Sequence, residues 1–146
     1  MRNRTRITAI AGMAAAGVAL LVSPALANWT QLNSSWSYEE ESRRWDDGDY
    51  TQVQFTNCDN VWVSGSSFDS VDIQVWRVIN NFPDDSYDLK TFTACYGGGT
   101  SSGAWSEIPT GTESYYFKIM DVGGVEHGGG PTAHVDKVYV DTTKAD

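Results

Sequence analysis

Apolar residues recur at every second position along most of this chain, and this alternation restricts the fold more than any other sequence feature. Val71, Ile73 and Val75 share one face of the range 70–80, which is the clearest example. A period of two residues is typical of a β-strand with one buried face. We expect strands at 29–38, 49–58, 61–63, 70–80, 89–96, 114–122 and 133–142.

Turn-forming residues separate these ranges at intervals of roughly ten residues, which is typical of small antiparallel β-proteins. They include Pro83, Pro109 and the glycine-rich ranges 97–103 and 123–131. The only candidate for a helix is the range 38–45, in which three glutamates precede two arginines. We therefore predict an all-β fold, a small antiparallel Ig-like β-sandwich with one disulfide, and a small β-barrel is the alternative.

The first 27 residues have the organisation of a cleavable signal peptide. Three arginines precede the apolar range 7–22, and Pro24 ends that range. Ala-Leu-Ala at 25–27 supplies the small residues of a cleavage site, so we expect cleavage after Ala27. An N-terminal membrane anchor is the alternative, which this cleavage motif disfavours. We expect the mature chain, 28–146, to be secreted and extracellular.

Cleavage would make the chain more acidic. Three of its 10 Lys and Arg residues lie in 1–27, so the mature chain has 7 of them against 19 Asp and Glu, a formal net charge of −12. Such a charge repels nucleic-acid phosphates and anionic membrane surfaces. We therefore expect neither nucleic acid nor, after cleavage, a membrane as the partner, and we expect another secreted protein.

The chain contains two cysteines, Cys58 and Cys95, and both lie in the expected mature part. An even number of cysteines in a secreted chain predicts a disulfide. Two free thiols are the alternative, and the spacing differs from the C-x-x-C motif of thiol redox sites. Whether the bond joins two sheets or two neighbouring strands is open at this stage.

Six tryptophans are many for a chain of this length. Trp62 and Trp76 lie within strand patterns, so we expect both in the core. Trp105 begins a turn-rich run and is expected to pack at a sheet edge.

The other three tryptophans, Trp29, Trp36 and Trp45, lie in polar sequence with weak periodicity. We interpret 28–48 as an N-terminal arm or as the first strand, followed by a β-sandwich domain at 49–146. If the segment is an arm, the three tryptophans are candidate partner-binding residues, because exposed tryptophans often anchor protein interfaces.

No group of residues in the sequence predicts catalysis or a cofactor. The serines lack the G-x-S-x-G context of a nucleophile elbow, and the acidic residues cluster in expected turns. The Asp-rich turns and the one His-containing group lack the spacing of calcium loops or zinc sites. These groups are Asp46, Asp47 and Asp49; Asp84, Asp85 and Asp88; and Glu126, His127, His134 and Asp136. We expect no enzyme activity, no metal and no cofactor.

The run from Cys95 through Trp105-Ser-Glu-Ile-Pro-Thr-Gly to Tyr115-Tyr-Phe-Lys-Ile, with a final valine-rich strand, resembles a group of small secreted β-sandwich proteins of actinobacteria. It is similar in particular to the adaptor subunit of umbrella toxin particles. In those particles a compact β-domain with a protruding N-terminal arm joins a lectin-like subunit to a long, repeat-bearing toxin chain. The resemblance covers 50–140 and implies that 28–45 is the arm.

Together these observations predict a secreted, non-enzymatic protein-interaction module. The resemblance implies an adaptor in an extracellular, toxin-like protein assembly. Two alternatives are a carbohydrate-binding module, in which Trp and Tyr faces stack on sugar rings, and a secreted enzyme inhibitor.

Overall fold

The computed structural model describes residues 28–61 and 69–143, and this part of the chain forms eight strands, in most of which buried and exposed side chains alternate. The strands are β1 (Trp29–Trp36), β2 (Trp45–Asp47), β3 (Thr51–Val61), β4 (Val71–Arg77), β5 (Asp85–Phe92), β6 (Thr100–Trp105), β7 (Glu113–Val122) and β8 (Thr132–Asp141), with the 3-10 turn η1 (Ala94–Gly97). Within these residues no helix is long and apolar enough to cross a membrane. The expected signal peptide, its cleavage site and Trp62 lie outside the described residues.

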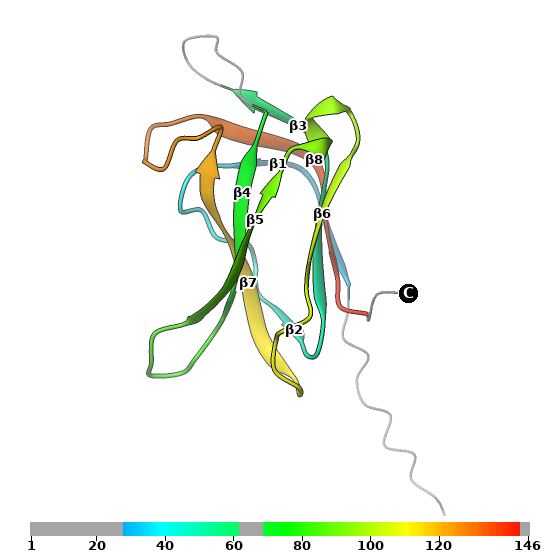
Figure 1. Cartoon of the computed structure of the whole chain (residues 1–146), viewed down its shortest axis with the longest axis vertical. Helices are drawn as coiled ribbons and strands as arrows, with labels where there is room; N and C mark the ends of the chain where they lie inside the picture. The colour runs from blue at the N-terminus through cyan, green and yellow to red at the C-terminus, as the bar shows by residue number, and fades with distance from the viewer. Residues whose placement is uncertain (1–27, 62–68, 144–146) are drawn as a thin grey trace, which may run out of the picture.

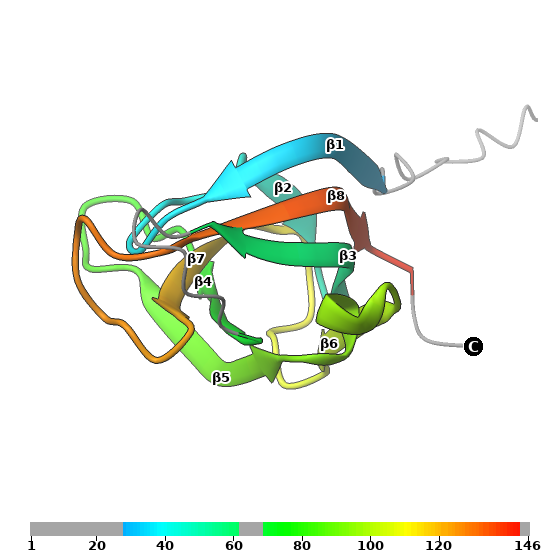
Figure 2. The same cartoon turned by 90° about the horizontal axis from the view of Figure 1, so that it is seen from above.

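The strands form two antiparallel four-stranded sheets that pack face to face (Figure 1 and Figure 2). The first sheet has the order β1-β8-β3-β6, and the second has the order β2-β7-β4-β5. These are two separate sheets, so the prediction of a small all-β sandwich is confirmed and the closed barrel is not formed. The chain passes from one sheet to the other between all consecutive strands except β4 and β5, so residues distant in sequence meet in the core.

The core lies between the two inner faces and contains most of the predicted apolar positions. Val71, Ile73 and Val75 of β4 are fully buried, as their shared face predicts. Phe55 of β3 and Phe117 of β7 come from opposite sheets, and their ring centroids lie 5.5 Å apart. Each such side chain contributes about 1.5–3 kcal/mol by burial, so this layer supplies much of the stability.

In three neighbouring strands of the first sheet, β1, β8 and β3, the alternation of buried and exposed side chains shifts at the same height of the sheet. The pairs Leu32–Lys137 and Ser34–Val135 flank this level, and Asn33, Asp136 and Asn57 lie on it. Asn33 and Asn57 have positive φ angles of 49° and 51°, a conformation that asparagine tolerates better than most residues. Two consecutive side chains on each strand therefore point outward here, and the buried positions shift by one residue beyond it.

The range 38–45 is not a helix, which corrects the prediction. Residues 38–39 form a turn, and the chain then runs along β7, where Ser42 donates its N–H to the carbonyl of Phe117 at 2.9 Å. The Ser42 side chain returns the contact, because its Oγ accepts the N–H of Phe117 at 3.0 Å. Pairing with β7 satisfies the backbone groups that a helix would have satisfied internally, so tertiary contacts override the charge pattern.

Two boundaries also differ from the prediction. Strand β6 lies in a range that we expected to be a turn, because serine and glycine residues hid its alternation. Strand β5 begins at Asp85 instead of 89, and Cys95 lies after it in η1. Ladder pairing with β4 organises β5 despite its many exposed polar residues.

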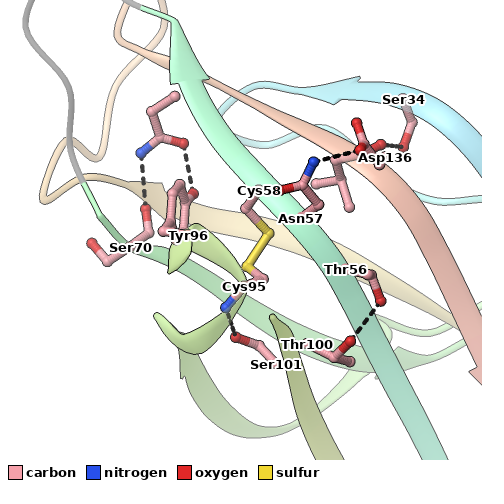
Figure 3. The surroundings of a disulfide bond; sticks show 12 residues. Ser34, Thr56, Asn57, Cys58, Ser70, Cys95, Tyr96, Thr100, Ser101 and Asp136 are labelled. Atoms are coloured by element: carbon pink, nitrogen blue, oxygen red, sulfur yellow. Dashed lines mark hydrogen bonds between the residues drawn. A yellow bond between two sulfur atoms is a disulfide. The ribbon is translucent and has the colours of Figure 1, made fainter. Parts of the chain in front are cut away.

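The predicted disulfide joins Cys58 of β3 to Cys95 of η1 (Figure 3). Because η1 lies where the chain crosses from β5 to β6, the bond fixes this crossover to the first sheet. Hydrogen bonds support the same junction: Ser101 Oγ accepts the N–H of Cys95 at 2.9 Å, and Tyr96 donates its hydroxyl to Asn60 at 2.6 Å. The bond therefore does not cross the centre of the core but closes one end of it.

Removing this bond should destabilise the fold. The cysteines are separated by 37 residues, and loop entropy in the unfolded chain gives about 4 kcal/mol for such a separation. We expect Cys58→Ala/Cys95→Ala to lower the free energy of unfolding by about that amount in urea, followed by tryptophan fluorescence. Wild-type protein reduced with dithiothreitol should give a similar value; a loss below about 1 kcal/mol in both would contradict the loop-entropy account.

Candidate functional site

The three tryptophans expected on an arm are buried in the core. Trp29, Trp36 and Trp45 are 4%, 3% and 5% exposed, so their rings are not available to a partner. Strand β1 pairs with β8 along its length, and β2 pairs with β7. The expectation of a protruding arm with partner-binding tryptophans is therefore wrong, and this segment contributes one strand to each sheet.

Aromatic packing and hydrogen bonds explain why these tryptophans turn inward. Their ring centroids lie 5.0–6.5 Å from that of Phe117. The indole N–H of Trp36 donates to Ser34 at 2.8 Å, and that of Trp45 donates to Thr51 at 3.2 Å. Polar neighbours in the sequence thus serve as partners for two of the three buried indoles, whereas the Trp29 indole N–H has no hydrogen-bond partner.

The remaining described tryptophans also differ from expectation in part. Trp105 is fully buried at the end of β6 and donates its indole N–H to the carbonyl of Asp88 at 2.7 Å. Trp76 points to the outer face of the second sheet and is half-buried instead of in the core, with the Lys118 Nζ 5.4 Å from its ring centroid. The platform of tryptophans that a sugar-binding site would use is therefore not formed by Trp29, Trp36, Trp45 or Trp105.

The polar clusters noted in the sequence are dispersed or weakly connected. Within the described residues no three His, Cys, Asp or Glu side chains are placed to hold a metal ion. His134 Nε2 lies 3.8 Å from Asp136 Oδ1, and its Nδ1 lies 3.3 Å from Ser35 Oγ, on the exposed face of the first sheet. Asn57 donates to the other carboxylate oxygen of Asp136, whereas His127 lies on a separate exposed loop.

An exposed phenylalanine is the strongest candidate for a binding residue. Phe82 is 73% exposed, more than the other exposed large apolar side chains of the described residues, which are Leu32, Val61 and Leu89. It lies in the loop 78–84 between β4 and β5, which projects from one end of the sandwich, at the lower left of Figure 1. Aromatic side chains are enriched at the centres of protein interfaces, and one at a loop tip is placed to enter a partner's pocket.

Hydrogen bonds hold this loop in one conformation. Asp84 accepts the N–H of Ile79 at 3.0 Å through Oδ1 and the hydroxyl of Tyr116 at 3.0 Å through Oδ2. The hydrogen bond from the Ile79 N–H stabilises the carboxylate and is the main reason why the pKa of Asp84 lies below its ordinary value. The carboxylate is therefore ionised at neutral pH. Val78 donates its N–H to Ser114 at 2.8 Å, which fixes the loop to β7. The loop is therefore organised before any partner binds.

Both ends of the loop carry charge. Asp84 follows Phe82 by two residues, and Asp85 begins β5 in an ion pair with Arg77. Asp88, further along β5, is also exposed. The apolar tip is thus bordered by carboxylates, of which Asp85 is neutralised by its partner.

The turn-forming residues of 80–85 predict a turn, but they do not identify Phe82 as a binding residue. Asn80, Asn81 and Pro83 identify the turn correctly, and Asn81 has a positive φ of 66°. The usable signal was the phenylalanine itself, because a large apolar residue among turn-forming residues has no strand face to pack on. Its exposure, however, depends on which way the loop leaves the sandwich.

Asp47 is the most perturbed carboxyl group of the described residues. It ends β2 and is completely buried, with Oδ1 accepting the N–H of Gly48 at 2.7 Å and Oδ2 lacking a hydrogen-bond partner. Burial raises the pKa of Asp47 to about 6, and the negative charge of Asp141 acts in the same direction. This group destabilises the fold when it ionises.

No protein-family model, curated protein or solved structure matches this chain. The resemblance to the actinobacterial β-sandwich proteins therefore stays a prediction.

Stability should fall as Asp47 ionises. Its pKa is about 6 in the fold against 3.8 for an ordinary aspartate, so the folded state binds more protons between these values. The free energy of unfolding should therefore decrease by about 2 kcal/mol from pH 4 to pH 8 on account of this group. We expect Asp47→Asn to remove that part of the pH dependence in urea unfolding. Asp46→Asn, at the exposed neighbouring residue, is the control, because it leaves Asp47 in place. An equal pH dependence of the free energy of unfolding in wild type, Asp47→Asn and Asp46→Asn would contradict the assignment to Asp47.

Proposed function

We propose that this chain is an exported, non-enzymatic protein-interaction module that binds another secreted protein through the loop 78–84. The observation that carries the proposal is Phe82, which is 73% exposed on a loop fixed by hydrogen bonds. In this role the β-sandwich is a scaffold, and the loop presents the anchor.

The energetics of Phe82 support an anchor role. Burial of an exposed phenylalanine in a partner's pocket contributes about 1.5–3 kcal/mol. A fixed loop loses little conformational entropy on binding, so more of this gain appears as affinity. Asp84 provides the fixation, since it bonds to both Ile79 and Tyr116.

The charge of the molecule supports a particular kind of partner surface. The expected mature chain has a formal net charge of −12, and Asp84 and Asp85 lie at the C-terminal end of the loop. A pocket for the phenyl ring, surrounded by Lys or Arg, would complement both features. Such a complex should form faster at low ionic strength than at high ionic strength.

Within this function an adaptor in an extracellular assembly is the role we favour, in line with the sequence resemblance. A secreted enzyme inhibitor is the second candidate, because a fixed, projecting loop also fits an active-site cleft. The carbohydrate-binding alternative loses its main support, since four of the described tryptophans are buried.

The proposal predicts that Phe82→Ala abolishes partner capture. The chain 28–146 is used as bait in the culture supernatant of the producing organism, and bound proteins are identified by mass spectrometry. We expect one or two proteins at fixed stoichiometry with wild-type bait and at least about tenfold less with Phe82→Ala, as for an interface anchor.

Leu89→Ala is the matched control, because Leu89 is also an exposed apolar residue of this sheet but lies on β5 outside the loop. It should capture as much as wild type. Both variants should keep the wild-type unfolding midpoint, since neither side chain is buried. Equal capture by wild type and Phe82→Ala, or no captured protein at all, would refute the proposed function.

A further inference from the structure

The sheet edges differ in how well they are protected from pairing with another strand. Strand β5 carries Asp85, Asp88 and Lys90, and the edge at β2 continues into the highly charged range 39–44. Strand β6 lacks charges but is covered by β5, since Trp105 donates to the Asp88 carbonyl at 2.7 Å. Charged side chains and coverage are the usual means of preventing strand addition.

Strand β1 has neither form of protection in its own residues, and the Arg43 guanidinium, 4.6 Å from the ring centroid of Trp29, lies over its first residue. Its eight residues, Trp-Thr-Gln-Leu-Asn-Ser-Ser-Trp, include no charged residue and no proline. Its backbone pairs with β8 on one side, and no described residue pairs with the other side. Leu32 is 64% exposed near its centre. A long, uncharged edge with an exposed leucine favours pairing with a further strand.

The pattern of burial along β1 is nearly symmetric. From the Leu32–Asn33 peptide outward in both directions, the residues are exposed, then wholly or partly buried, then exposed, then buried. The change of alternation at Asn33 produces this symmetry, because it places Leu32 and Asn33 both outward. Trp29 and Trp36 occupy the two buried ends.

We propose that β1 pairs in antiparallel orientation with β1 of a second copy of this chain. The two-fold axis passes between the two strands, at the level of their Leu32–Asn33 peptides. Only this register places exposed residues opposite exposed ones and buried residues opposite buried ones along the whole strand. The two first sheets then form one continuous sheet, and the contact is isologous and closed. The irregular residue Asn33 lies at the centre of the pair, so it interrupts the new ladder at one level only.

Electrostatics favours β1 over the other edges as the contact between copies. Two chains that each carry a formal net charge of −12 repel each other over most of their surfaces. Pairing through β1 places no like charges directly opposite one another, because the strand has none. Salt shortens the range of the remaining repulsion, so the dimer should be more stable at high ionic strength.

Sedimentation equilibrium of the chain 28–146, which contains every described residue, tests this dimer. At low protein concentration we expect the mass of a monomer in about 0.05 M salt and a shift toward the mass of a dimer in about 0.5 M salt. The dissociation constant of the dimer should be at least about tenfold lower in the higher salt than in the lower salt. A monomer mass at every concentration and salt level would overturn the proposal.

Leu32→Lys separates strand pairing from general repulsion. The substitution makes the net charge of each copy less negative, so general repulsion alone predicts stronger association. In the proposed pair it places two lysines beside the two-fold axis, and we expect dissociation to increase at least about tenfold. Leu32→Asp should act in the same direction.

Leu89→Lys makes the same change of charge on β5 and should not weaken the dimer. Both sites are exposed, so the variants should fold, which the unfolding midpoint verifies. Equal effects of Leu32→Lys and Leu89→Lys would overturn the proposed interface. Because this experiment uses the chain alone, its outcome is independent of the partner proposed for the Phe82 loop.

Discussion

Contacts of Phe117 with aromatic rings of both sheets hold the sandwich together. This residue of β7 lies within 6.5 Å, ring centroid to centroid, of Trp29, Trp36 and Trp45, and it also meets Phe55 of β3. The rings come from β7 and from the first three strands, which are distant from β7 in the sequence, so their packing requires both sheets to be in register. The position of the N-terminal segment follows from this cluster, because two of its tryptophans lie on β1 and the third lies on β2.

The aromatic cluster also determines where binding surfaces remain. The N-terminal tryptophans are used in the core, and the large apolar side chains of the described residues that reach solvent include Phe82 at the tip of the loop 78–84 and Leu32 at the centre of β1. In the proposed complexes the first serves as a side-chain anchor on a fixed loop, and the second lies on a backbone edge. These two surfaces use different recognition physics, and their positions on the fold allow the proposed partner complex and the proposed dimer to be studied separately.

A single local irregularity connects the fold of the first sheet to its edge. The left-handed conformations of Asn33 and Asn57, with Asp136 between them, shift the alternation of three strands together. Without this shift, Trp29 and Trp36 could not both face the core on one strand, because their separation of seven residues is odd. The same shift gives β1 its symmetric pattern, so the core packing and the proposed pairing share one cause.

The sequence by itself determined the all-β class, the sandwich, the disulfide and most strand positions, because period-two alternation, regularly spaced turns and two cysteines are local signals. It did not determine the direction of the side chains in 28–48, the extended form of 38–45 or the strand nature of 100–105. The first two features depend on hydrogen bonds and aromatic contacts to β7 and β8, which lie far away along the chain. The third depends on the pairing of β6 with β3. The exposure of Phe82 likewise followed only from the tertiary structure, because Asp84 fixes the loop by bonding to Tyr116 on another strand.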